Sequence, residues 1–487
     1  MSKYVVLTGA SGLVGRYLVK DLLLAGKQLA LVLRPSAKET VAERAEAILQ
    51  FWEQRLGRHL PRPVVLEGDV AEPNLGLSPE SAEWIAAHCD IMIHNAAILT
   101  FYGEDRAGEP WRTNLDGTAH TIEFCLKAGI KHFHYVSTAY VAGQRHDLCR
   151  EDELDKGQGF RNDYEHSKFL AEQLVRNTKG FETITVYRPA VIAGDSQTGY
   201  TNTYHGIYAY LKLMSVLVWN TPPGPDGRRH TPIRLDITGD EPRNIVPVDW
   251  ISACMARLFT TRAAWGGTYH LSPQHLMTAR EVIEAGYKYF NSYGVEFGKA
   301  KVEHHERSDF EQAAYENKTM YQPYETTDPV FDTTNLKKFT ADIPCPEIDE
   351  AMIQRFWKYG EEDRWGKRRH PRAKVEFYVA EQLAQRVSER CEDGERTTLG
   401  LNVTGPGGGQ WTLELSGDVL CRVLPGLPEG DSPQVDLDRD EFAALLRGEA
   451  LSPLGLISQQ TSGAGEELAA RVLKAVFSAT PTVTRAS

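Results

Sequence analysis

The chain has 487 residues, which is too long for one typical domain and fits two or three. Its formal net charge is −12, which argues against a general nucleic-acid-binding protein, because such proteins usually present a basic face. No run of about 18 uncharged apolar residues and no secretory leader pattern is found, so we expect no membrane-spanning helix and a cytoplasmic location.

Strand-like and helix-like segments alternate in the first part of the chain. The predicted strands cover residues 4–7, 28–33, 64–66, 91–94, 133–136 and 183–187. The predicted helices between them cover residues 15–25, 39–55, 117–127 and 164–176. Short apolar strands that alternate with helices are typical of a parallel sheet covered on both faces. The sequence therefore predicts an α/β fold with a Rossmann-type doubly wound parallel sheet.

The pattern changes twice further along the chain. Residues 200–360 are less regular and predict a small substrate cap, which completes a reductase domain over 1–362. A basic run, "RWGKRRHPRAK", lies within the predicted linker 363–374, with an anion-binding patch for a CoA or carrier-protein phosphate as the alternative. Predicted helices at 375–391, 438–449 and 465–477 surround glycine-separated strands at 397–405, 409–418 and 419–426, which predicts a separate C-terminal α+β domain over 375–487.

The cysteines and histidines give no metal-binding pattern. Two adjacent histidines, His304 and His305, do not face the same way on a helix, so we predict no metal site there. Seven cysteines are scattered without a CxxC spacing, and their odd number predicts reduced, mostly buried thiols without a disulfide framework. These cysteines are Cys89, Cys125, Cys149, Cys254, Cys345, Cys391 and Cys421.

A glycine-rich turn stands between the first predicted strand and the first predicted helix. A turn of this kind lets a pyrophosphate approach the backbone closely, and the helix N-terminus supplies free N–H groups. The residues predicted to bind a dinucleotide here are Gly9, Ser11, Gly12, Leu13, Val14 and Gly15.

The end of the second predicted strand indicates which dinucleotide is bound. NAD-specific sites usually carry an acidic residue there, whereas this chain has Arg34, followed by Lys38 and Arg44. A planar guanidinium suits a 2′-phosphate, so we predict NADPH as the cofactor. After the third strand, Asp69 and Val70 are predicted to contact the adenine end. The small residues after the fourth strand are predicted to let the backbone lie against the cofactor; they are Asn95, Ala96 and Ala97.

A hydroxyl, a phenol and an ammonium follow near the fifth predicted strand. Ser137 and Thr138 stand at its carboxyl end, where ligands bind in open parallel sheets. Tyr164 and Lys168 are four residues apart on a predicted helix, which places them on one face. An ammonium beside a phenol is expected to lower the pKa of that phenol, which makes Tyr164 a candidate general acid–base residue.

The strings "TGASGLVG", "GDV", "HNAA", "NLDGT", "VSTAYVAG", "YEHSK" and "YRPAVIAG" resemble the extended short-chain dehydrogenase/reductases over residues 1–360. The strings "RPAVIAGDSQTG" and "PVFDTTNLKKF" resemble the thioester-reductase and fatty-acyl-reductase branch, the male-sterility type. This resemblance implies a catalytic triad of Thr138, Tyr164 and Lys168, with Lys168 also holding the nicotinamide ribose. It also places Arg188 and Pro189 beside the nicotinamide.

The implied function is NADPH-dependent reduction of a hydrophobic acyl thioester, carried on CoA or a carrier protein, to an aldehyde or alcohol. The C-terminal strings "GGGQWTLELSGDVLCRVLPG" and "VDLDRDEFAALLRGE" resemble the sterol-carrier-protein-2 fold, which implies lipid binding; a small packing or dimerisation domain is the alternative. Two other functions stay open: an NADP(H)-dependent ketone or alcohol dehydrogenase acting on a steroid-like or polyketide lipid, and a non-catalytic lipid-binding or transfer protein.

Overall fold

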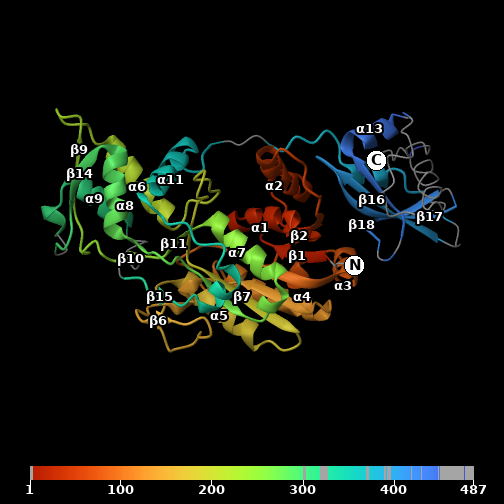
Figure 1. Ribbon diagram of the computed structural model, residues 1–487, viewed down its shortest axis with the longest axis horizontal. Helices are drawn as coiled ribbons and strands as arrows, with labels where there is room; N and C mark the ends of the chain where they lie inside the picture. Colours follow the sequence, from red (N-terminus) through yellow and green to blue (C-terminus); the bar gives the residue numbers. More distant parts are fainter. Residues whose placement is uncertain are drawn as a thin grey trace. The chain divides into compact units, whose positions relative to one another are not determined.

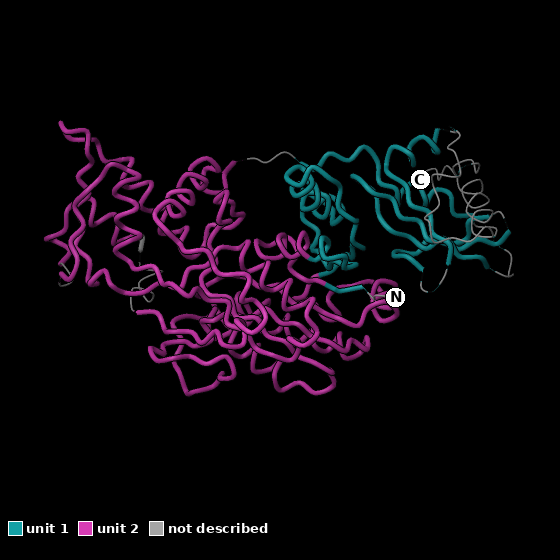
Figure 2. The backbone as a smooth tube through the Cα atoms, in the orientation of Figure 1, with its two compact units in different colours: residues 1–6, 22–68, 371–487 teal, residues 7–21, 69–370 magenta. Residues whose placement is uncertain are grey.

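A computed structural model describes residues 4–299, 303–318, 327–368, 372–388, 391, 396–417, 419–428, 430, 432–447, 449 and 477. The chain forms two compact units (Figure 2). One contains residues 1–6, 22–68 and 371–487, and the other contains residues 7–21 and 69–370. The boundary that the sequence suggested, a linker over 363–374 after a reductase domain of 1–362, stays a prediction.

A seven-stranded sheet carries the predicted Rossmann topology (Figure 1). Its strands, in their order across the sheet, are β12 (Thr268–Leu271), β7 (Thr183–Pro189), β5 (His132–Val136), β4 (Cys89–His94), β1 (Tyr4–Thr8), β2 (Leu29–Leu33) and β3 (Val64–Glu67). The pairs β2–β3, β4–β5, β5–β7 and β7–β12 are parallel. The strand order reverses between β1 and β4, and the carboxyl ends of strands at such a switch point form the usual ligand site. The predicted α/β fold is confirmed.

The helices near residues 15–25, 39–55, 117–127 and 164–176 follow the predicted segments closely, whereas those at 79–88 and 248–260 were not predicted. They are α1 (Leu13–Leu24), α2 (Val41–Leu56), α3 (Pro79–His88), α4 (Gly117–Lys127), α5 (Asp163–Asn177) and α7 (Val248–Thr260). Local chemistry sets their ends, as in α2, where Thr40 and Glu43 form a capping box and Gly57 ends the helix in the left-handed region. The helix predicted over 39–55 therefore starts two residues later than expected.

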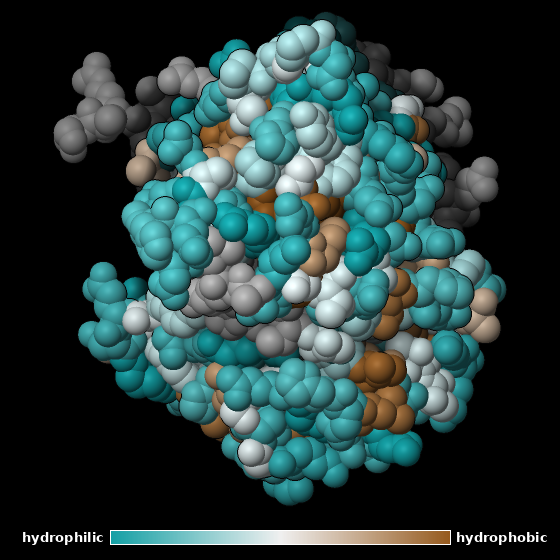
Figure 3. Space-filling model, turned by 90° about the vertical axis from the view of Figure 1, so that its left-hand side faces the viewer, coloured by the Kyte–Doolittle hydropathy of each residue, from teal (hydrophilic) through white to brown (hydrophobic). Residues whose placement is uncertain are grey.

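The predicted cap region forms a layer of helices around a large apolar cluster, beside a smaller one of Ile233, Leu235 and Ala314. Its helices are α6 (Ile207–Asn220), α8 (Ala279–Phe290), α9 (Asp309–Lys318) and α11 (Glu350–Glu362), beside the parallel pair β9 (Arg229–Arg234) and β14 (Ser292–Glu296). Phe356 and Trp357 are completely buried at its centre. The remaining short elements are β6 (Leu148–Cys149), β8 (Val191–Ala193), β10 (Pro242–Arg243), β11 (Ile245–Pro247), β13 (Met277–Thr278), β15 (Val330–Phe331) and α10 (Thr334–Thr340). Figure 3 shows a mostly hydrophilic face with small, separate hydrophobic patches.

The C-terminal region contains the four-stranded sheet that its glycine-separated strands predicted. The strands β16 (Arg396–Thr404), β17 (Gly409–Ser416), β18 (Val419–Pro425) and β19 (Gln434–Asp438) lie in the order β18-β17-β16-β19. Side chains alternate between buried and half-buried along β17, so one face carries the apolar cluster. The helix α13 (Arg439–Leu446) is confirmed, whereas the helix predicted over 375–391 is only α12 (Val379–Ala384). The helix predicted over 465–477 lies outside the described residues except for Phe477.

The C-terminal sheet and helix α2 belong to the same compact unit, and polar contacts connect them. The Glu46 carboxylate accepts a hydrogen bond from Gly407 N (3.0 Å) while it pairs with the buried guanidinium of Arg62. The Tyr4 hydroxyl donates to Gln410 Oε1 at 2.8 Å. These contacts explain why residues 22–68 group with the C-terminal region.

One disulfide corrects the prediction that all cysteines are single thiols. Cys391 and Cys421 form a disulfide with their Cα atoms 5.7 Å apart, whereas Cys89, Cys125, Cys149, Cys254 and Cys345 are free. The two partners are 30 residues apart in the sequence, and Cys421 lies on β18. Disulfides are rare in reducing compartments, so this pair bears on the cytoplasmic location, which stays a prediction. Among the described residues, no helix has the length and apolar character to cross a membrane.

Candidate active site

The glycine-rich turn connects β1 to α1 and has no room for side chains at two positions. Gly9 has a φ of +71°, and a Cβ on it would lie 2.7 Å from Ala96 N. A Cβ on Gly15 would lie 2.1 Å from Gly9 O. Ser11, Gly12, Leu13 and Val14 complete the turn and the start of α1, where helical N–H groups lack intrahelical partners. A turn this tight suits the close approach of dinucleotide phosphates, and their binding here stays a prediction.

The segment after β4 is tied to the end of β1 by the side chain of Thr8. Its buried hydroxyl accepts hydrogen bonds from Asn95 N and Ala96 N, both at 3.2 Å, and lies 2.9 Å from His94 Nδ1. The Asn95 amide donates to Gly9 O at 3.1 Å. The structure thus brings Asn95 and Ala96 against the glycine turn, and Ala97 follows them in the chain.

Asp69 and Val70 follow β3 in the same compact unit as the glycine turn. The Asp69 carboxylate accepts a hydrogen bond from Ala71 N at 3.0 Å, and the Val70 side chain is buried. Their contact with an adenine stays a prediction.

The basic residues predicted to select NADPH lie at the end of β2 and the start of α2. The Arg44 guanidinium donates to the carbonyl oxygen of Arg34, so these two residues are neighbours. Arg34 and Lys38 are exposed. The structure shows a basic cluster at the strand end and does not test the cofactor that it selects.

Thr138 and Tyr164 are brought together, as the resemblance implied. Thr138 follows β5, and its hydroxyl interacts with Tyr164, which lies in the first turn of α5. The neighbouring hydroxyl, Ser137, instead donates to the buried carboxylate of Glu172 at 2.6 Å. These contacts favour Thr138 over Ser137 as the hydroxyl that works with Tyr164.

The pKa of Tyr164 differs from the predicted direction. Burial raises it to about 12, and the hydrogen bond with Thr138 only partly opposes that rise. The expected lowering by the Lys168 ammonium does not occur. A phenol with this pKa is protonated at neutral pH, which is the form that donates a proton during a reduction.

Lys168 is buried beneath the end of β5. Its ammonium donates to Val136 O at 2.8 Å and lies 4.3 Å from the centre of the Tyr135 ring. Burial lowers the pKa of Lys168 to about 7, and the negative charge of Glu172 opposes that fall. The ammonium is therefore easily lost near neutral pH.

Arg188 and Pro189 end β7, beside Thr138. The Thr138 hydroxyl lies 3.5 Å from Pro189 O. The Arg188 side chain is 2% exposed and donates to the Glu172 carboxylate at 2.7 Å. Its guanidinium is therefore occupied by protein partners, and the backbone of Arg188 and Pro189 is left for the predicted cofactor contact, which stays a prediction.

Asn114 is a site residue to which the sequence analysis gave no role. It is completely buried on a π-helical turn (η2, Arg112–Asp116) that precedes α4. Its amide accepts from Ile98 N at 2.9 Å and donates to Ile98 O at 3.0 Å and to Ser167 Oγ at 3.2 Å. Asn114 thus ties the segment after β4 to the face of α5 between Tyr164 and Lys168. The string "NLDGT" contained it, but a buried asparagine cannot be told from an exposed one by sequence.

Sequence comparisons find one matching family and several relatives of this chain. Residues 7–255 match the family described as "Male sterility protein". A linear gramicidin synthase protein from Brevibacillus parabrevis is 27% identical over 376 residues, which cover 73% of this chain and 7% of that protein. The aldehyde reductase lnaA from Aspergillus flavus is 25% identical over 395 residues, which cover 73% of this chain and 36% of that protein. The chain therefore spans well under two thirds of these relatives.

Solved structures share the fold. The terminal R domain from the myxalamid PKS-NRPS biosynthetic pathway has a TM-score of 0.60 and 24% identity, covering 75% of this chain and 92% of that domain. A reductase (R) domain of a nonribosomal peptide synthetase from Mycobacterium tuberculosis has a TM-score of 0.51 and 19% identity, covering 74% of this chain and 92% of that domain.

Proposed function

Because the chain belongs to the male sterility protein family, a family of nicotinamide-dinucleotide-binding oxidoreductases, we propose that it reduces a carrier-bound or CoA-bound acyl thioester with NADPH. The observation that carries this proposal is the meeting of Thr138 and Tyr164 beside buried Lys168. The relative named as an aldehyde reductase supports chemistry that involves an aldehyde.

The chain's own residues fit the chemistry of a thioester reduction. The glycine turn holds the dinucleotide, which supplies the hydride when bound. Thr138 and Tyr164 donate hydrogen bonds to the thioester oxygen, where negative charge develops, and Tyr164 gives its proton to that oxygen. The resulting hemithioacetal collapses, the carbon–sulfur bond breaks, and an aldehyde and a free thiol leave. A second hydride and a second proton give the alcohol.

The test is a coupled assay with acyl-CoA and acyl-carrier thioesters of increasing chain length. We expect loss of NADPH absorbance together with one free thiol for each aldehyde formed. Oxidation of NADPH with lipidic ketones but without thiol release would contradict thioester reduction and favour a ketone reductase.

We expect Arg34→Glu to weaken the use of NADPH. A hydrogen-bonded charge on the 2′-phosphate contributes about 1.5–3 kcal/mol, so kcat/KM with NADPH should fall about tenfold while kcat/KM with NADH falls much less. Steady-state kinetics with both cofactors checks this. Arg58→Glu makes the same charge change at an exposed position at the far end of α2 and should leave the preference unchanged.

We also propose that the C-terminal domain binds lipid, as its likeness to sterol carrier protein 2 implied. Support comes from its one-sided sheet, whose buried face gathers Leu401, Trp411 and Leu413. Binding of a fluorescent fatty acid to the full chain, competed by unlabelled acyl chains, is the expected result. Failure to bind any acyl chain would contradict lipid binding and favour the alternative, a packing or dimerisation domain.

A further inference from the structure

Glu172 is a completely buried carboxylate on α5, one helical turn after Lys168, with no role in the catalysis described above. It accepts hydrogen bonds from Ser137 Oγ at 2.6 Å, from Arg176 Nε at 2.8 Å and from Arg188 Nη2 at 2.7 Å. A buried charge is costly unless it is paired and hydrogen-bonded, and this one is satisfied from two strands and its own helix.

The partners of Glu172 lie beside the reacting groups. Ser137 immediately precedes Thr138, so its bond to Glu172 fixes the end of β5 at the point where the Thr138 hydroxyl emerges. Arg188 immediately precedes Pro189, whose carbonyl lies beside that same hydroxyl. The Glu172 carboxylate therefore joins the ends of β5 and β7, which lie next to Thr138.

Glu172 also acts on Lys168 through charge. The groups that face the ammonium are the Val136 carbonyl and the Tyr135 ring from β5, His94 from β4 and Glu172 from α5. His94 is neutral, because burial lowers its pKa to about 3. Among these described neighbours Glu172 carries the negative charge that stabilises the ammonium, and its own partners Arg176 and Arg188 offset part of that charge.

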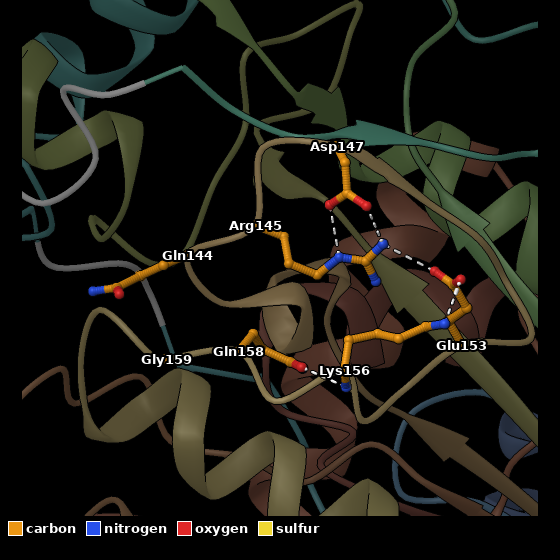
Figure 4. A pocket seen from close by; sticks show the side chains of 7 residues that line it. All are labelled: Gln144, Arg145, Asp147, Glu153, Lys156, Gln158 and Gly159. Atoms are coloured by element: carbon orange, nitrogen blue, oxygen red, sulfur yellow. Dashed lines mark hydrogen bonds and ion pairs between the residues drawn. The ribbon is translucent and has the colours of Figure 1, made fainter.

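The network continues outward to a cavity of about 430 Å³ (Figure 4). Arg188 Nη2 donates to Glu153 O at 2.7 Å, and the Glu153 carboxylate pairs with Arg145 and Lys156, which line the cavity. In Figure 4 the charged groups of this cavity point toward one another and not into open space. The ion pairs of this cavity therefore hold Glu153, whose carbonyl oxygen accepts a hydrogen bond from Arg188. We assign no ligand to the cavity.

We propose that Glu172 is a positioning residue of the reductase, which favours the charged form of Lys168 and fixes Thr138 through Ser137 and Arg188. This inference rests on the proposed function for its kinetic consequences. Its structural consequence, the charge state of Lys168, can be measured without any substrate.

The first test is Glu172→Gln, followed by NMR of the full chain labelled with 13C at the lysine Cε, with the Lys168 signal assigned by its loss in Lys168→Arg. Glu172 raises the pKa of Lys168, so its removal should move the Lys168 titration midpoint down by about one pH unit. The alkaline limb of kcat should move down with it, and kcat at neutral pH should fall about tenfold with little change in the KM for NADPH. Glu123→Gln removes an exposed carboxylate from α4 and should change none of these quantities.

An unchanged Lys168 midpoint in Glu172→Gln would overturn the proposal, even with a lower kcat, because a merely structural role does not require that shift. If Glu172→Gln does not fold, Ser137→Ala tests whether Glu172 fixes Thr138 through Ser137. This variant removes one hydrogen bond and no charge. Ser137→Ala should lower kcat several-fold at an unchanged Lys168 midpoint, and an unaffected kcat would overturn the proposal. A wild-type protein inactive on thioesters would refute the proposed function, while the Lys168 midpoint would still decide the role of Glu172.

Discussion

Tyr164→Phe should lower kcat for thioester reduction about 10³-fold, because it removes the proton donor and leaves the rest of the site in place. The phenol is the group best placed for this role. It interacts with the Thr138 hydroxyl, and its raised pKa of about 12 keeps it protonated at neutral pH. Single-turnover oxidation of NADPH, measured with saturating cofactor and thioester, separates this loss from any change in binding.

NADPH should still bind to the Tyr164→Phe variant, because the glycine turn and Lys168 are unchanged. Tyr293→Phe, at a half-exposed position in the cap, is the matched loss of a phenol hydroxyl and should retain full activity. A Tyr164→Phe variant that kept about a tenth or more of the wild-type rate would show that another group supplies the proton.

Gly15→Ala should weaken the binding of NADPH about 100-fold. The new Cβ would lie 2.1 Å from Gly9 O, so the turn that cradles the phosphates has to shift. Overpacking of this kind costs about 1–3 kcal/mol, and the upper end corresponds to the expected loss. Calorimetric titration of the variant with NADPH gives the dissociation constant directly.

The control for this change is Gly108→Ala, because the space around Gly108 accommodates a methyl group, with its nearest neighbour at 3.6 Å. Its affinity for NADPH and its melting temperature should equal those of the wild-type protein. Unchanged affinity in Gly15→Ala would mean that the turn does not hold the cofactor.

The fold could be predicted because the strands and helices leave strong local signals. Strands β1 and β2 are short, apolar and fully buried, β5 is short and fully buried, and α4 begins and ends where its periodicity placed it. The glycine turn was predictable for a related reason, since only glycine fits where the backbone of Gly9 and Gly15 comes so close.

Other features depend on tertiary structure. The direction of the Tyr164 pKa shift was predicted wrongly, and the partner of Arg188 and the disulfide were not predicted. The sequence showed an ammonium near Tyr164 but not the burial that dominates its pKa. It placed Arg188 at a strand end, but β7 is buried on both faces, so no alternation of polar and apolar residues indicated that this side chain joins Glu172. Cys391 and Cys421 pair across 30 residues that no local pattern connects.

The most direct test of thioester reduction is the transfer of deuterium from NADPH deuterated at the nicotinamide C4 to the product formed from an acyl thioester. The account predicts an aldehyde, or an alcohol after a second transfer, that carries the deuterium on the former thioester carbon, with free thiol released in equal amount. Both should be lost in Tyr164→Phe. An acyl thioester that is recovered intact, or a product without deuterium at that carbon, would contradict the account.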